Sequence, residues 1–276
     1  MYKEKIKQAI EILDELDLDM WMIFGRESHT IHDPAADMVV GSGYTWHSAF
    51  IICRDGDSAA IIGNLDHSNF EKMGTYKRVI PYLKSIQADL LDFVNEKNPG
   101  KIAINFSENN VMADGLTHGL YLTLMSYFKD SSFADRFVSS EMILSALRGR
   151  KSQSEIDKIK HAIDETEHLY ERIGKFLKPG QSEKDVHNQL AAWIREKGYE
   201  TAWTPAQCPS VFTGMPEEGE AHTGPTDKKI EKGHVLNMDF GLKINDYCSD
   251  LQRTWYILQD GETEAPQAVV DGFNAV

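Results

Sequence analysis

The sequence predicts an α/β domain with a mixed sheet and flanking helices over residues 1–145, followed by an α+β domain over residues 146–276. At roughly 150 residues per domain, a length of 276 residues suggests two domains. Apolar residues alternate between helical and strand spacing in the first part, whereas in the second part long helices precede the strands. The basic segment from Arg148 to Lys151 marks the change of pattern.

In the first domain, apolar residues at helical spacing predict a helix over 6–16. Short apolar runs predict strands, and Asp55-Gly56 between two of these runs predicts a hairpin. The predicted strands cover residues 21–24, 49–53, 59–62, 79–80 and 101–106. Helical stripes over 86–94 and 116–128 complete the domain, and the antiparallel hairpin makes its sheet mixed.

The second domain begins with a helix that Ser152 and Glu155 open as a capping box. Pro179-Gly180 ends that helix, and Ser182 with Asp185 opens a second one. The pattern then changes to strands over 235–240 and 251–258, and residues 267–276 indicate a further helix. Helices followed by an antiparallel run of strands are typical of an α+β domain.

Composition excludes several classes of protein. The formal net charge is −14, and both the residues before Lys151 and those after it carry more acidic than basic side chains. Nucleic-acid binding is therefore not expected, because phosphate neutralisation needs clustered lysine and arginine. The sequence contains no apolar stretch of about 18 residues, so we expect no membrane segment. Three scattered cysteines without a Cys-x-x-Cys pair favour a reducing, cytoplasmic location.

Two aspartates in the second domain are candidates for metal ligands. Asp239 lies near the end of an apolar run, and Asp250 precedes the next one. If the two runs form a hairpin, both carboxylates can face the same side, where a divalent cation would relieve their repulsion. The alternative is that both are strand-end aspartates that point to water. Asp239-Phe240-Gly241 also matches a protein-kinase triplet, but the chain has neither a His-Arg-Asp loop nor a glycine-rich phosphate loop.

The full pattern resembles the metal-binding hairpin of the pita-bread metallopeptidases, which include methionine aminopeptidase, aminopeptidase P, prolidase and creatinase. The motif consists of Asp239 and Asp250 with Tyr247, Ser249 and Arg253-Thr254 between and after them. Upstream, residues 147–156 resemble the linker and first helix of the family, and residues 208–214 precede His222 as they do in the family. Residues 1–145 resemble the creatinase-type N-terminal domain of prolidases and aminopeptidase P, so the likeness covers nearly the whole chain.

The resemblance implies a role for each matching residue. Asp239 corresponds to an aspartate that chelates one metal ion, and Asp250 to an aspartate that bridges both ions of a dinuclear centre. His222 corresponds to a histidine that hydrogen-bonds the substrate carbonyl or the tetrahedral intermediate. The implied enzyme is a cytoplasmic Xaa-Pro dipeptidase or aminopeptidase, with two divalent ions, manganese first and cobalt or zinc as alternatives. The implied substrates are small proline-containing peptides, and the implied assembly is a homodimer.

The resemblance also implies three ligands that this chain lacks. The family's site uses two aspartates, one histidine and two glutamates, and the histidine and glutamates lie on later strands. We therefore expect the chain to be the amino-terminal portion of a longer protein, to bind metal weakly if at all, and to be inactive as given. Two alternatives remain: a creatinase-like, metal-free amidinohydrolase and a non-catalytic pita-bread binding protein. Retention of both aspartates favours the metal enzyme over the metal-free one.

Histidines in the first domain have weaker interpretations. His29 and His32 are spaced as a ligand pair, but a solvated loop is the expected setting without a helix. Trp46-His47 has two interpretations: the pair lines a substrate entrance, or the tryptophan packs within the domain.

Overall fold

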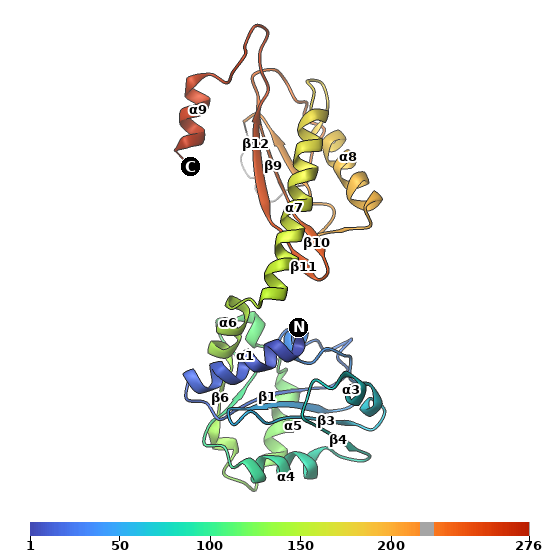
Figure 1. Cartoon of the computed structure of the whole chain (residues 1–276), viewed down its shortest axis with the longest axis vertical. Coiled ribbons are helices and arrows are strands. Elements are labelled where there is room, and N and C mark those ends of the chain that lie inside the picture. Colours follow the sequence, from blue (N-terminus) through green and yellow to red (C-terminus); the bar gives the residue numbers. More distant parts are fainter. Residues whose placement is uncertain (216–223, 276) are drawn as a thin grey trace. The chain divides into compact units, whose positions relative to one another are not determined.

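The computed structural model describes residues 1–215 and 224–275 (Figure 1). The chain divides into two compact units, Met1–Ser152 and Gln153–Val276, and each is treated separately below. The first unit therefore includes helix α6 (Glu141–Gly149), which the expected boundary at residue 145 would divide. Within the described residues, no helix is both long and apolar enough to cross a membrane.

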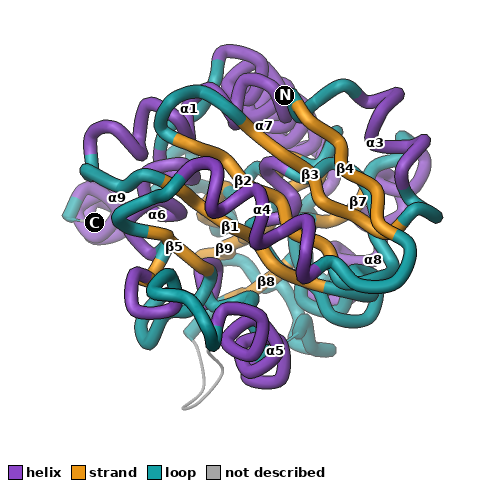
Figure 2. Tube along the Cα trace, turned by 90° about the horizontal axis from the view of Figure 1, so that it is seen from below, coloured by secondary structure: helices purple, strands orange, loops and turns teal. Residues whose placement is uncertain are grey.

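The first unit is built on a mixed sheet of six strands in the order β4-β3-β2-β1-β5-β6. The strands are β1 (Met20–Gly25), β2 (Ser48–Cys53), β3 (Ser58–Gly63), β4 (Arg78–Tyr82), β5 (Ile102–Ile104) and β6 (Phe137–Ser139). Strand β2 pairs antiparallel with both β1 and β3, whereas the other pairs are parallel, so only β2 runs against the rest. Figure 2 shows β1, β2, β3 and β4 side by side, with α4 in front of them. The predicted α/β class and the Asp-Gly hairpin are confirmed.

Helices cover both faces of this sheet because alternate side chains of its strands point to opposite faces. The helices are α1 (Tyr2–Glu15), α2 (Ala36–Val39), α3 (His67–Met73), α4 (Gln87–Lys97), α5 (His118–Phe128) and α6, with 3₁₀ turns at Val111–Ala113 and Ala134–Arg136. Side chains of α1, α2, α3 and α6 join one apolar cluster with Trp21 and Ile23. Side chains of α4 and α5 join a second cluster with Met22 and Phe24 on the other face.

A buried polar network fixes the loop that follows β1. Asn105, just after β5, accepts hydrogen bonds at Oδ1 from Trp21 Nε1 (2.8 Å) and Ser140 Oγ (2.7 Å). Its Nδ2 donates to both carboxylate oxygens of Asp33, at 3.1 and 2.9 Å, and the Ala35 amide donates to the same carboxylate. Burial raises the pKa of Asp33, although these hydrogen bonds oppose the change. The network pairs polar groups that would be costly to bury alone.

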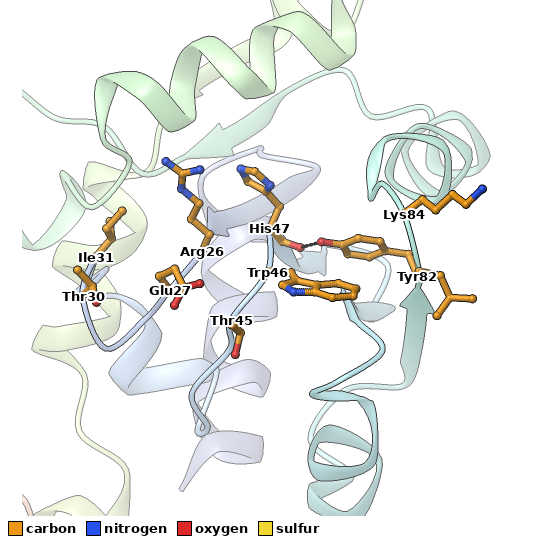
Figure 3. Close-up of a pocket in the computed structure, with 10 residues that line it drawn as sticks. Arg26, Glu27, Thr30, Ile31, Thr45, Trp46, His47, Tyr82 and Lys84 are labelled. Atoms are coloured by element: carbon orange, nitrogen blue, oxygen red, sulfur yellow. Dashed lines mark hydrogen bonds between the residues drawn. The ribbon is translucent and has the colours of Figure 1, made fainter.

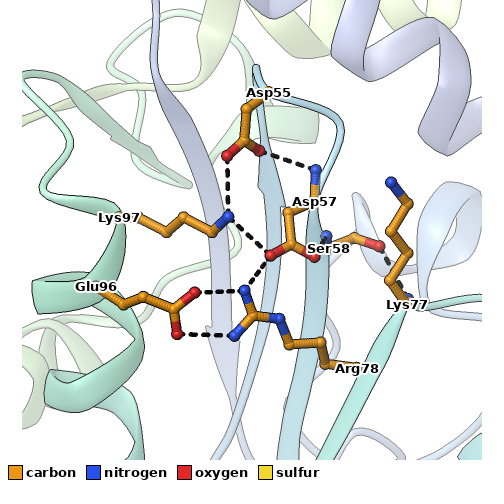
Figure 4. Close-up of polar contacts among 7 residues, drawn as sticks. All are labelled: Asp55, Asp57, Ser58, Lys77, Arg78, Glu96 and Lys97. Carbon is orange, nitrogen blue, oxygen red and sulfur yellow. Dashed lines mark hydrogen bonds and ion pairs between the residues drawn. The ribbon is translucent and has the colours of Figure 1, made fainter.

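Ion pairs attach the Asp-Gly turn to the neighbouring strand and helix (Figure 4). Lys97, the last residue of α4, lies 2.9 Å from Asp55 Oδ2 and 2.8 Å from Asp57 Oδ2. Arg78 of β4 bridges Asp57 and Glu96. Burial lowers the pKa of Lys97, but its hydrogen bonds to Asp57 and Asp55 outweigh this and raise the pKa to about 12. For Asp57, burial raises the pKa, and hydrogen bonds from Lys97 and Arg78 lower it below its usual value.

We predict that Asp57→Asn lowers the free energy of unfolding by about 1–2 kcal/mol at neutral pH, because Arg78 and Lys97 each lose a charged partner. A carboxylate with a lowered folded-state pKa stabilises the fold above its unfolded pKa, near 3.8, and that contribution disappears as pH falls through the folded pKa. Urea unfolding at several pH values measures the difference. Asp92→Asn, at an exposed position of α4, is the matched control; equal losses in both variants, or a loss that persists at low pH, would contradict the prediction.

The second unit combines two long helices with two antiparallel sheets. Its helices are α7 (Gln153–Phe176), α8 (Glu183–Glu196) and α9 (Gln267–Asn274). One sheet has the order β12-β9-β8 and the other β11-β10-β7. The strands are β7 (Glu200–Thr201), β8 (Ser210–Thr213), β9 (Val235–Phe240), β10 (Leu242–Ile244), β11 (Tyr247–Cys248) and β12 (Leu251–Tyr256). The predicted α+β class is confirmed. The predicted start of α8 at Ser182 and Asp185 is also confirmed, and in the structure these two residues form a capping box.

One long hairpin contributes strands to both sheets of this unit. β9 and β12 pair in the first sheet, and their continuations β10 and β11 pair in the second. The turn uses Asn245 and Asp246, both with positive φ, as tight hairpins require. The short strands β7, β10 and β11 were not predicted, because stretches of two or three residues carry too little periodicity.

Candidate active site

The predicted site begins on β9, the central strand of its sheet. Exposure alternates along the strand, so that Leu236, Met238 and Phe240 are buried while Asn237 and Asp239 lie on the opposite face. The buried residues pack with apolar side chains of α7 and α8, such as Tyr170 and Leu190. Asp239 is therefore directed away from α7 and α8, towards the opposite face of the sheet, which it shares with Asn237.

Asp250 comes immediately before β12, at the place where the hairpin passes from one sheet to the other. Gly241 occupies the corresponding place after β9, and its residue type is fixed by crowding: a Cβ there would lie 1.8 Å from the Ser249 carbonyl oxygen. Ser249 is buried, whereas Asp250 is exposed. Gln252 lies opposite Asp239 in register, and Asp250 precedes it by two residues, so the direction of β12 extended back to Asp250 places this carboxylate on the face of Asp239.

Helix α7 holds this crossing point through side-chain hydrogen bonds. Thr166 Oγ1 lies 2.7 Å from Ser249 Oγ, and Ser249 Oγ accepts a hydrogen bond of 2.9 Å from the Leu242 amide. One turn further along, Tyr170 Oη donates to the carbonyl oxygens of Leu251 (2.6 Å) and Met238 (3.1 Å). Burial raises the pKa of Tyr170, so this phenol stays protonated as a donor. These contacts hold one face of the hairpin against α7, and the two aspartates lie on the other face.

On the outer face, Asp239 lies between Ser210 of β8 and Gln252 of β12 in register. Gln252 Nε2 donates a hydrogen bond of 3.1 Å to Asp239 Oδ2, and Asp239 Oδ1 is shielded from solvent. Asn237 Nδ2 donates to Thr254 Oγ1 on the same face. Sequence reasoning missed Gln252, because only the cross-strand register reveals that it faces Asp239.

The outward carboxylates of Asp239 and Asp250 fit part of a site for a hard divalent cation, which prefers oxygen ligands. They supply two of the several ligands that such an ion needs. Among residues 1–215 and 224–275, no group of three or more His, Cys, Asp and Glu side chains is placed to hold a metal ion. The two carboxylates are thus oxygen ligands of the kind that the predicted metal centre needs, and they account for two of its ligands.

The third predicted site residue, His222, lies outside the described residues. The segments on either side of 216–223 are both bound by one carboxylate, that of Glu183 at the start of α8. Its Oε1 accepts from the Thr213 amide at 2.9 Å, and its Oε2 accepts from the Thr226 amide at 2.9 Å and from Thr226 Oγ1 at 2.7 Å. Glu183 is only 3% exposed, and the positive end of the α8 dipole further stabilises its charge.

We predict that Glu183→Gln destabilises the second unit by about 1–3 kcal/mol, since one acceptor oxygen is replaced by an NH₂ group that faces N–H donors. Hydrogen exchange should accelerate most at the amides of Thr213 and Thr226. Glu196→Gln, an exposed glutamate on the same helix, is the control and should leave both the stability and the exchange rates nearly unchanged. Unaltered exchange at Thr213 and Thr226 in Glu183→Gln would refute the assignment.

A helix-backed antiparallel hairpin that presents two aspartates, preceded by a mixed α/β domain, has the fold of a pita-bread metallopeptidase. Residues 157–276 match the family model described as metallopeptidase family M24. This match spans nearly all of the second unit, and it is that unit, rather than the whole chain, that the match assigns to metallopeptidase family M24. The predicted family and fold class are thereby confirmed.

Curated relatives agree at low identity. The chain is 28% identical over 233 residues to an uncharacterised peptidase of Bacillus subtilis, YqhT, across 83% of this chain and 62% of the relative. It is 26% identical over 182 residues to a protein of Mycoplasma genitalium named as an Xaa-Pro aminopeptidase, across 62% of this chain and 49% of the relative. The chain thus spans about half to three-fifths of the length of these relatives.

Solved structures show the same fold. An Xaa-Pro dipeptidase from Bacillus anthracis superposes with a TM-score of 0.67 at 22% identity, covering 100% of this chain and 69% of that one. The dipeptidase PepE from Mycobacterium ulcerans gives a TM-score of 0.64 at 18% identity, covering 99% and 68%.

Proposed function

We propose that this protein is a metal-dependent peptidase that hydrolyses the bond before proline in small peptides. The observation that carries the proposal is the pair of aspartates, Asp239 and Asp250, on the outward face of the hairpin in a unit that matches the M24 family. The names of the relatives support the same class, since one is called an Xaa-Pro dipeptidase and another an Xaa-Pro aminopeptidase.

In this proposal, the chain's own residues bind the metal ions and the substrate. Asp239, oriented by Gln252, would hold one divalent ion, and Asp250 would be shared between two. Such ions, when bound, lower the pKa of a coordinated water so that hydroxide is available near neutral pH. His222 would donate a hydrogen bond to the oxygen on which negative charge develops during attack on the peptide carbonyl.

A bond that precedes proline needs a dedicated enzyme, because the proline nitrogen carries no hydrogen and the ring fixes the local geometry. The resemblance supports manganese as the metal and a homodimer as the assembly, and both belong to this proposal. A reducing, cytoplasmic location is also proposed. It is supported by Cys53, Cys208 and Cys248, which are all free thiols.

The test is hydrolysis of Ala-Pro and of a longer Xaa-Pro peptide by the complete product of the gene, with added manganese. We predict release of the first residue, and a loss of at least about a thousandfold in kcat/KM for Asp239→Asn and Asp250→Asn, which remove charged metal ligands. Asp246→Asn is the matched control, because Asp246 is exposed in the hairpin turn and asparagine tolerates its positive φ. No release from either peptide, or an equal loss in the control, would contradict the proposal.

A further inference from the structure

A pocket of about 520 Å³ lies in the first unit, at one edge of its sheet (Figure 3). We call it the β1-edge pocket; it is lined by residues 26–27, 30–31, 45–47 and 82–84. These segments follow the carboxyl ends of β1 and β4 and precede β2. The sheet grows from β1 through β2 to β4 on one side and through β5 to β6 on the other. The lining residues come from the side of β1 on which β2 and β4 lie.

The electrostatic character of the pocket differs from that of the chain, whose net charge is −14. Arg26, Lys84 and His47 contribute positive or ionisable groups, against the single carboxylate of Glu27. Figure 3 shows Arg26 and His47 extending to the same side of the pocket, while Glu27 points the other way. In the part of the chain that the structure describes, no acidic side chain pairs with Arg26 or His47.

His47 is held in place rather than free to turn away. Its ring stacks on Phe24, with centroids 5.7 Å apart and an angle of 11° between the planes. Its carbonyl oxygen accepts a hydrogen bond of 2.8 Å from Tyr82 Oη. Burial, followed by the charge of Arg26, lowers the pKa of His47. Arg26 and His47 both line the pocket, and an anion bound between them would favour the protonated imidazole.

An apolar wall lies beside these groups. Trp46 packs across Gly63 of β3, where a Cβ would come within 2.7 Å of the indole, so this close contact requires glycine. The indole also lies 5.8 Å from the ring of Tyr82. Leu83, at the rim, is 74% exposed. The two interpretations of Trp46-His47 are thus compatible, because the packed tryptophan also forms a wall of the pocket.

We propose that the β1-edge pocket binds a small organic anion, whose carboxylate or phosphate group lies between Arg26 and His47 and whose apolar part contacts Trp46 and Leu83. The geometry supplies a planar guanidinium and an imidazole for the charged end and an aromatic face for the remainder. The volume is typical of small-molecule sites. This inference concerns the first unit alone and does not depend on the proposed peptidase activity.

The test is NMR titration of the full chain with four probes: acetate, benzoate, inorganic phosphate and phenyl phosphate. We expect saturable shifts of the His47 imidazole signals and a rise in the His47 pKa, since a bound anion favours the imidazolium. His168, exposed in the second unit, should not respond. Tighter binding of benzoate than of acetate, or of phenyl phosphate than of inorganic phosphate, would show that the apolar wall contributes. Tighter binding of benzoate than of phenyl phosphate would identify a carboxylate ligand, and the reverse order a phosphate ester.

Arg26→Gln should weaken binding by about tenfold or more, because a charge-assisted hydrogen bond is lost. Arg26 is exposed, so the substitution leaves the core intact. Arg148→Gln, at an exposed arginine of α6 outside the pocket, is the matched control and should bind as the unmodified chain does. The proposal fails if no probe saturates, if Arg26→Gln binds equally well, or if the aromatic ring adds no affinity in either pair.

Discussion

The hydrogen bond between Thr166 of α7 and Ser249 of the hairpin, 2.7 Å long, is the contact on which the candidate active site depends. It occurs where Gly241 allows the strands to cross from one sheet to the other. Ser249 is held towards the helix, whereas the direction of β12 places the next residue, Asp250, on the face of Asp239. Tyr170 fixes the register beside it by donating to carbonyl oxygens of both strands. The hydrogen bonds of Thr166 and Tyr170 hold one face of the hairpin against α7, and the two aspartates share the opposite face.

In each unit, a buried side chain that makes several hydrogen bonds holds segments that are distant in the sequence. In the first unit, Asn105 and Asp33 anchor the chain after β1, which leads into the β1-edge pocket. In the second, Glu183 binds Thr213 and Thr226 on either side of the segment that contains His222. Satisfied polar groups of this kind fix the residues that they bind, because losing these contacts leaves a buried charge or donor unpaired.

The sequence predicted the strongly periodic elements, and the structure explains which others it could not predict. Helices such as α1 and α7 and strands such as β2 and β9 bury one face or both, so their apolar spacing is visible in the chain. Strands β7 and β11 have two residues each and exist only because β10 pairs with them. Asp239 and Asp250 could be singled out by spacing and resemblance. Gln252 and Glu183 could not, because their partners are set by cross-strand register and by contacts between distant segments.

The central claim is that Asp239 and Asp250 form one outward-facing pair that attracts a divalent cation. Paramagnetic broadening by Mn²⁺ tests this directly, because a weakly bound ion still broadens the amide signals around it. At low Mn²⁺ concentration, we predict simultaneous broadening around residues 238–241 and 249–252, abolished by Asp239→Asn and retained in Asp246→Asn. Broadening confined to one of the two stretches, or strongest at the exposed acidic residues of the first unit, would contradict the claim.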